Sequence, residues 1–175
     1  MRIPIGAATV TVVTLMNVLL GFAATGRIGP LHCGMPLAGA EEVLGPGRPH
    51  PQIVMKGPDF DGYPYAWGGL ELVVTRRHVS GISIRLDPGS AARLPPEVLP
   101  DAGACAATFL REDFTAALDA AGCRRVTNAA LTFDEQSAFT TRPAGVNVLF
   151  GVPVAGVDAP DRSRFYLEFL DKQTA

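Results

Sequence analysis

The sequence predicts an α+β protein built from tandem helix-plus-antiparallel-sheet units, with the helices packed on one face of the sheet. A helix signal followed by alternating strand signals occurs in residues 27–100 and again in residues 101–175. The apolar positions of the two segments coincide when one is laid on the other. With 175 residues, of which 47% are hydrophobic, the chain is long and apolar enough for both units to share one core.

Composition excludes two broad classes of protein. Hydrophobic residues are too frequent, and charged residues at 18% too few, for an intrinsically disordered chain. Fifteen basic and seventeen acidic residues give a net charge of -2. Nucleic-acid binding needs clustered Lys and Arg that release counterions. We therefore expect no nucleic-acid partner.

The first helix is expected over residues 37–44. Leu37, Ala40 and Leu44 are spaced as i, i+3 and i+7, so they lie on one helical face. Pro36 suits the first turn, where its missing N–H costs nothing. The run Gly45-Pro46-Gly47 opens a loop rich in proline, glycine and histidine and ends the helix.

Two strands are expected after this loop. Leu70, Leu72 and Val74 share one face of a half-buried strand over residues 63–75. The Arg76-Arg77-His78 segment predicts a turn into a second strand over residues 79–86, in which branched apolar residues alternate with polar ones. The pair is therefore predicted to be an antiparallel hairpin.

The second unit repeats this order. Apolar residues spaced at helical intervals predict a helix that Gly122 ends: Phe114, Ala117, Leu118 and Ala121. Three strands are expected over residues 136–141, 146–150 and 165–170. In the last of these, strict alternation would place Phe165, Leu167 and Phe169 on one face.

The two units align by their buried positions. A shift of 77 residues places Leu37, Ala40 and Leu44 on Phe114, Ala117 and Ala121, and a shift of 76 places Leu70, Leu72 and Val74 on Val146, Val148 and Phe150. The one-residue difference must lie in the intervening loop, because slipping a strand by one residue would turn its apolar face to water. The pattern indicates an internal duplication.

The N-terminal segment permits two interpretations. Residues 3–25 carry no charge and are long enough to cross about 30 Å of hydrocarbon as a helix. Small residues before position 27 fit a signal cleavage after Gly26, so residues 1–26 would be an export signal or a membrane anchor. The alternation of Thr and Val over residues 8–14 equally suits a buried N-terminal strand or helix. An exported or membrane-anchored location is the first expectation, and a cytoplasmic one is the alternative.

The stretch LHCGMPLAGAEEVLGP, residues 31–46, has Gly-Met, then small and acidic helix residues, then Leu-Gly-Pro. It resembles the SmpA/OmlA type of outer-membrane assembly lipoprotein and the β-lactamase-inhibitor-protein fold. The opening is also similar to small uncharacterised bacterial proteins of immunity type. The resemblance covers residues 27–86 and implies helical units on an antiparallel sheet whose open face binds another protein. Pro30-Leu31-His32, before Cys33, is too bulky for a lipoprotein processing site.

The motifs of common enzymes are absent from the sequence. It contains no Gly-x-Ser-x-Gly and no phosphate-binding loop. His32, His50 and His78 lie in separate contexts without the i, i+4 spacing of a helical metal site. The three cysteines, Cys33, Cys105 and Cys123, form no CxxC pair; only Cys105 and Cys123 are close enough in sequence to suggest a disulfide in an exported protein. We therefore expect no enzyme, no metal and no cofactor.

Aromatic and basic residues are the candidates for a binding surface. Tyr and Trp anchor protein interfaces because they bury large rigid area and keep a polar group. Arginine pairs are favoured at interfaces but more often lie at solvated turn ends, as Arg124 and Arg125 are expected to do. The candidate binding residues are Phe60, Tyr63, Tyr65, Trp67, Arg76 and Arg77. Core packing is the alternative for the aromatic residues.

The sequence favours non-catalytic binding of another protein, of inhibitor or immunity type. The open face of the sheet and its loops would form the contact. A different class is an envelope-associated scaffold or assembly protein, which would touch the membrane only through residues 3–25 acting as an anchor.

Overall fold

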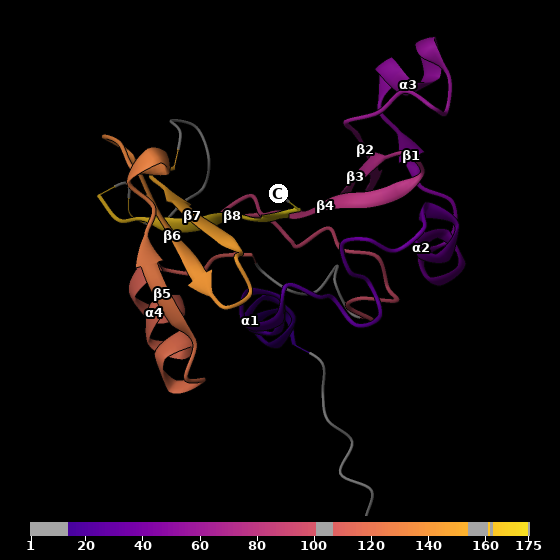
Figure 1. Cartoon of the computed structure of the whole chain (residues 1–175). Coiled ribbons are helices and arrows are strands. Elements are labelled where there is room, and N and C mark those ends of the chain that lie inside the picture. The colour runs from indigo at the N-terminus through magenta and orange to yellow at the C-terminus, as the bar shows by residue number, and fades with distance from the viewer. Residues whose placement is uncertain (1–13, 101–106, 154–160, 162, 175) are drawn as a thin grey trace, which may run out of the picture.

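The computed structural model describes residues 14–100, 107–153, 161 and 163–174. Its strands form one antiparallel sheet of eight, in the order β1-β2-β3-β4-β8-β7-β6-β5 (Figure 1). The predicted α+β class with an antiparallel sheet is confirmed. From each edge inward the strands follow chain order, β1 to β4 from one edge and β5 to β8 from the other. The last strand of each set, β4 and β8, pair at the centre of the sheet.

Each half consists of a helix followed by four strands. In the first half these are α2 (Leu37–Leu44), β1 (Arg48–Pro49), β2 (Tyr63–Trp67), β3 (Leu70–Thr75) and β4 (His78–Arg85), with the short helix α3 (Pro51–Lys56) between β1 and β2. In the second half they are α4 (Arg111–Ala120), β5 (Arg124–Thr127), β6 (Gln136–Arg142), β7 (Asn147–Gly151) and β8 (Tyr166–Gln173), with the 3-10 turn η2 (Ala129–Leu131) between β5 and β6.

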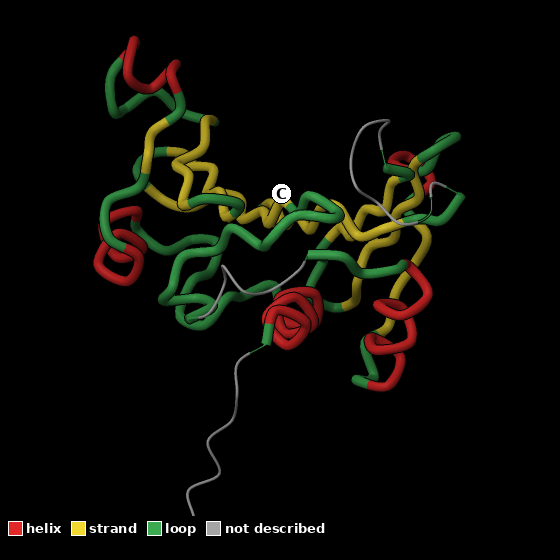
Figure 2. The backbone as a smooth tube through the Cα atoms, turned by 180° about the vertical axis from the view of Figure 1, so that it is seen from behind, coloured by secondary structure: helices red, strands yellow, loops and turns green. Residues whose placement is uncertain are grey.

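The helices are distributed unevenly around the sheet. Figures 1 and 2 show α1 (Leu15–Thr25), α2 and α4 on the same side of the sheet, whereas α3 lies at its far end beyond β1 and β2. Helix α1 contacts both α4 and β6, and α4 contacts β8. The apolar faces of α1, α2 and α4 join the inward residues of the strands in one hydrophobic core.

The long strand expected over residues 63–75 is in fact two strands. A turn at Gly68 and Gly69 separates β2 from β3, and the two pair with each other. Gly68 has a φ of +65°, which favours glycine, and a side chain at Gly69 would place its Cβ 2.7 Å from the carbonyl oxygen of Arg85. The buried positions change parity across the turn, from Tyr65 and Trp67 in β2 to Leu70, Leu72 and Val74 in β3, so the alternation is not that of one continuous strand.

The face predicted for residues 165–170 is wrong at one position. The register between β7 and β8 shifts: Phe150 lies opposite Leu167, but Leu149 lies opposite Phe169. This bulge adds one residue to β8, so strict alternation is lost. Leu167 and Leu170 therefore both face the core, and Phe169 lies on the opposite, uncovered face of the sheet.

Helix α1 places the N-terminal segment in the core. Its apolar face is fully or nearly fully buried at Leu15, Leu19, Phe22 and Ala23. The hydroxyl of Thr141, itself fully buried on β6, donates a hydrogen bond of 2.6 Å to the carbonyl oxygen of Ala23. Residues 15–25 thus form a buried N-terminal helix, one of the two interpretations of the sequence; residues 1–13 lie outside the described residues.

No helix in the described part of the chain has the length and apolar character needed to span a membrane.

Candidate binding site

Two of the predicted binding residues lie in the core. Tyr65 is 7% exposed and Trp67 is 8% exposed, and both belong to the hydrophobic core cluster. The Trp67 indole N–H donates a hydrogen bond of 3.0 Å to the carbonyl oxygen of Gly45, just after α2. Both side chains thus pack in the core, which is the alternative that the sequence left open for the aromatic residues.

The other four predicted residues lie together at the far end of the sheet. The rings of Phe60 and Tyr63 are half-buried and stack with their centroids 5.2 Å apart. Arg76 and Arg77 are exposed at the tip of the β3–β4 hairpin, where both have positive φ. The Arg76 backbone N–H donates a 2.6 Å hydrogen bond to the carboxylate of Asp61, which joins the hairpin tip to the aromatic loop.

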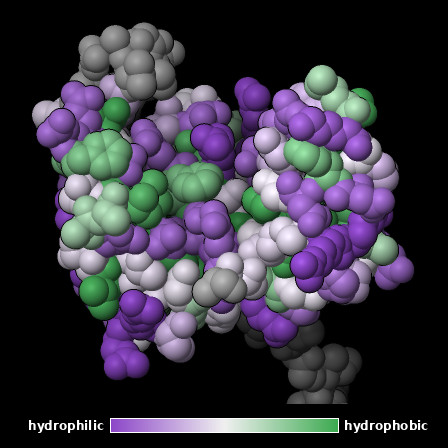
Figure 3. All heavy atoms as spheres, turned by 45° about the horizontal axis from the view of Figure 1, so that its top comes forward, coloured by the Kyte–Doolittle hydropathy of each residue, from purple (hydrophilic) through white to green (hydrophobic). Residues whose placement is uncertain are grey.

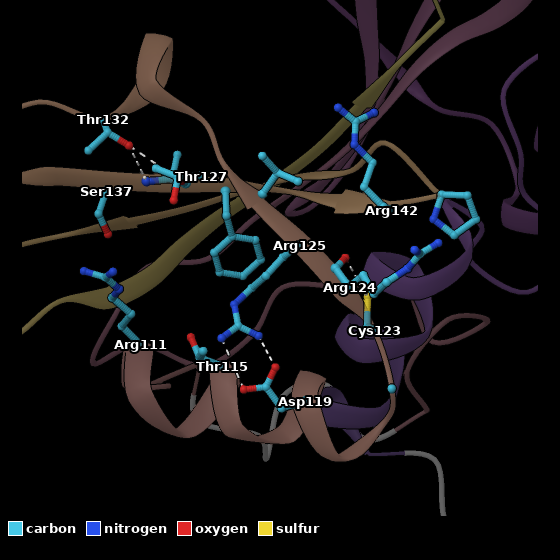
Figure 4. Close-up of a pocket in the computed structure, with 15 residues that line it drawn as sticks. Arg111, Thr115, Asp119, Cys123, Arg124, Arg125, Thr127, Thr132, Ser137 and Arg142 are labelled. Carbon is cyan, nitrogen blue, oxygen red and sulfur yellow. Dashed lines mark hydrogen bonds and ion pairs between the residues drawn. The ribbon is translucent and has the colours of Figure 1, made fainter.

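A large concavity lies elsewhere, between α4 and the strands β5 and β6. This α4–β6 groove has a volume of about 1240 Å³ and opens at β5, the last strand of the sheet (Figure 4). Its lining includes Arg111, Thr115 and Asp119 from α4, and Arg125, Ser137 and Phe139 from the strands.

One residue of β6 that lines the groove is small. Ser137 of β6 corresponds to Tyr63 of β2. Ser137 lies opposite Phe150 of β7, and Tyr63 lies opposite Val74 of β3, which is the residue that the 76-residue shift places on Phe150. By the same comparison Phe139 corresponds to Tyr65. The first half thus has two tyrosines where the second half has a phenylalanine and a serine. Serine is the smallest of these four side chains, and it lines the α4–β6 groove.

Two buried hydroxyl groups in the groove have no hydrogen-bond partner. They are Oγ of Ser137 and Oγ1 of Thr115, and among the described residues they are the only buried side-chain polar atoms left unpaired. Ser137 is 9% exposed. Figure 4 shows the Ser137 hydroxyl pointing into the groove from the sheet and the Thr115 hydroxyl pointing into it from the helix. An unpaired buried hydroxyl costs about 1–3 kcal/mol.

Four arginine side chains line the same groove. Arg111, Arg124, Arg125 and Arg142 line the groove, against the single acidic residue Asp119. Asp119 pairs with Arg125, and the hydrogen bond from this guanidinium lowers the pKa of the Asp119 carboxyl. The Arg111 guanidinium lies 5.9 Å from the centroid of the Phe165 ring and forms no ion pair with any described residue. The groove is therefore positive, although the whole chain has a net charge of -2.

The thiol in the groove is not activated. Cys123 is a free, buried cysteine, and burial raises the pKa of its thiol, which keeps it protonated. Cys33 is also free, and burial raises the pKa of its thiol as well. Cys105, the predicted disulfide candidate for Cys123 in an exported protein, lies outside the described residues.

The histidines lie apart from the groove and from one another. Each hydrogen-bonds to nearby backbone: His32 to the Cys33 carbonyl, His78 to the Arg76 carbonyl, and His50 accepts from the Gln52 N–H. Within the described ranges no three His, Cys, Asp or Glu side chains gather as a metal would require.

The uncovered face of the sheet is a second, flatter surface. Figure 3 looks toward this side of the molecule, where hydrophobic side chains are scattered among hydrophilic ones. The half-buried pair Leu149 and Phe169 lies on it, with the Arg85 guanidinium 5.3 Å from the Phe169 ring centroid. Asp171, in the same face, has its carboxyl pKa raised by burial. This face offers contact area, but among the described residues it carries no unpaired buried side-chain polar atom.

Comparisons with protein-family models, with curated proteins and with solved structures give no match. The chemistry of the α4–β6 groove is therefore the main guide to function.

Proposed function

We propose that the chain is a non-catalytic protein-binding module, of inhibitor or immunity type, and that the α4–β6 groove is its main contact. The observation that carries this proposal is the pair of unpaired buried hydroxyls, Ser137 and Thr115, in a groove that four arginine side chains also line. Buried polar groups are nearly always paired, and a functional site is one of the accepted reasons for an exception.

The composition of the groove argues for binding and against catalysis. Acyl transfer by Ser137 or Thr115 would need an adjacent base, and the residues that line the groove include no histidine. The one carboxylate, Asp119, is held ionised by Arg125 and its lowered pKa makes it a poor general base. The Cys123 thiol is protonated for the reason given above.

The shape of the groove favours a segment of protein chain over a small molecule. Small-molecule sites enclose most of their ligand within mainly apolar walls. This groove is open along the sheet edge and has arginine on both sides. Arginine is enriched in protein interfaces because its planar fork makes several hydrogen bonds at once.

The burial of α1 weighs against the envelope-scaffold alternative. A membrane anchor made from residues 3–25 would have to withdraw Leu19 and Phe22 from the core and remove the acceptor of the buried Thr141 hydroxyl. Withdrawal of two large apolar side chains costs several kcal/mol.

Blocking the groove tests the proposal. The tagged full-length chain, expressed in its native host, is used to capture binding proteins, which are quantified by mass spectrometry. Thr127 is an exposed residue of β5 that lines the groove and lies opposite Phe139, so Thr127→Tyr places a ring over the opening. The wild type is expected to capture one partner in stoichiometric amount. We expect the variant to capture at least about tenfold less of that partner.

Thr75→Tyr is the matched control. Thr75 is also an exposed threonine at the end of a strand, but it precedes Arg76 at the other end of the molecule. Capture by this variant should equal that of the wild type. Loss with Thr75→Tyr and retention with Thr127→Tyr would instead assign binding to the hairpin tip and the aromatic loop around Phe60 and Tyr63.

A further inference from the structure

We propose that the α4–β6 groove recognises a carboxylate side chain on an acidic segment of the partner, and that Ser137, Thr115 and Arg111 form its binding site. This inference rests on the proposed function and names the chemistry of the bound segment. The partner is thereby defined as a protein that presents exposed Asp or Glu to this groove.

The two hydroxyls have the chemistry that a carboxylate needs. Each hydroxyl carries one proton to donate, and an ionised carboxylate only accepts. Because Ser137 enters the groove from the sheet and Thr115 from the helix, one carboxylate between them would accept from both walls (Figure 4). Hydrogen bonds to an ionised acceptor are about twice as strong as those between neutral groups.

Arg111 provides the balancing charge. Arg125 is already neutralised by Asp119, whereas Arg111 contacts an aromatic ring and pairs with no carboxylate among the described residues. Arg111 and Ser137 both line the α4–β6 groove, Arg111 from the helix and Ser137 from the sheet (Figure 4). A guanidinium fork binds a planar carboxylate through two parallel hydrogen bonds, so Arg111 and the hydroxyls can share one ligand.

The charge distribution favours a carboxylate over a phosphate group. Asp119 and Arg125 neutralise each other, so the proposed site of Ser137, Thr115 and Arg111 carries one positive charge. A phosphate monoester carries about two negative charges at neutral pH and a carboxylate carries one. Nucleic acid is disfavoured in addition by the net charge of the chain, which is -2.

Synthetic peptides test this inference on the full chain. The probe is a short peptide of alternating threonine and glutamate, and its control has glutamine in place of glutamate. Binding is measured by calorimetry and by NMR of the arginine side-chain N–H groups. We expect the glutamate peptide to bind roughly tenfold or more tightly than the glutamine peptide, and added salt to weaken it.

Three variants assign the residues. Arg111→Gln should weaken the binding of the glutamate peptide by roughly tenfold. Arg48→Gln removes an exposed arginine of β1 outside the groove and should leave the affinity for this peptide unchanged. Ser137→Ala should also weaken binding, yet leave the midpoint of thermal unfolding the same or higher, because the lost hydroxyl has no partner in the free protein. A purely structural serine would lower that midpoint.

Specific outcomes would overturn the carboxylate site. Equal binding of the two peptides would do so, as would equal losses in Arg111→Gln and Arg48→Gln, or tighter binding of a phosphoserine peptide than of the glutamate peptide. If no peptide binds while Thr127→Tyr still abolishes partner capture, the carboxylate inference fails and the proposed function stands. If the glutamate peptide binds but Thr127→Tyr leaves capture intact, the proposed function fails at this groove.

Discussion

A chain that begins at Arg27 is expected not to fold. Removing residues 1–26 takes Leu15, Leu19, Phe22 and Ala23 out of the core and exposes the part of β6 that α1 covers. Deletion of one large buried apolar side chain costs about 2–5 kcal/mol, and the whole domain is stable by only about 5–15 kcal/mol. The loss of this helix therefore exceeds what the remaining core can offset.

Circular dichroism and thermal unfolding of the truncated chain test this expectation. A finer comparison uses Phe22→Ala, which should lower the free energy of unfolding by roughly 3–5 kcal/mol, and Asn17→Ala at an exposed position of the same helix, which should change it by less than about 0.5 kcal/mol. Cleavage after Gly26 would produce the same truncated chain. Cooperative unfolding of that chain at the wild-type temperature would contradict the place of α1 in the core and restore the signal-segment interpretation.

Trp67→Ala is expected to destabilise the protein by roughly 3–5 kcal/mol. The indole is 8% exposed, and it donates a hydrogen bond to the Gly45 carbonyl that ties β2 to the end of α2. It also packs so closely on Gly47 that no side chain fits there. The substitution leaves a cavity and an unpaired carbonyl group together.

Phe60→Ala is the comparison for Trp67→Ala. Phe60 comes from the same aromatic run of the sequence, but it is half-buried in a loop and packs against Tyr63 and Lys56. Chemical denaturation should therefore separate the two variants, with a loss of about 1 kcal/mol or less for Phe60→Ala. Similar small losses in both would mean that Trp67 is not a core residue.

The regular elements of the fold could be predicted from the sequence because their apolar residues are periodic. The helix over residues 37–44 and the strand over residues 136–141 agree with α2 and β6 to within a residue at each end. The edge strands β1 and β5 could not be predicted, since each is short and half or more exposed, so no alternation marks it. The N-terminal apolar segment, in contrast, permitted two predictions, because residues 3–25 suit a membrane and a protein core equally well.

Only a small part of the candidate site was visible in the sequence. Arg124 and Arg125 stand out as a basic pair, although they were expected to be solvated turn ends. Ser137 and Thr115 have no sequence signal, because a small hydroxyl residue in a strand or helix is common. Aligning the halves does not reveal Ser137 either: two residues separate β2 from β3 and four separate β6 from β7, so a shift that aligns β3 with β7 places Tyr63 away from Ser137.

A cross-linking measurement tests the central claim, that the α4–β6 groove contacts a partner protein. A small diazirine-bearing amino acid replaces Thr127 beside the groove or Thr75 at the opposite end of the molecule, in the full chain in its native host. After illumination, we expect one covalent adduct of a protein partner from position 127 and none from position 75. An adduct from position 75 alone would contradict the account and move the binding surface to the β3–β4 hairpin.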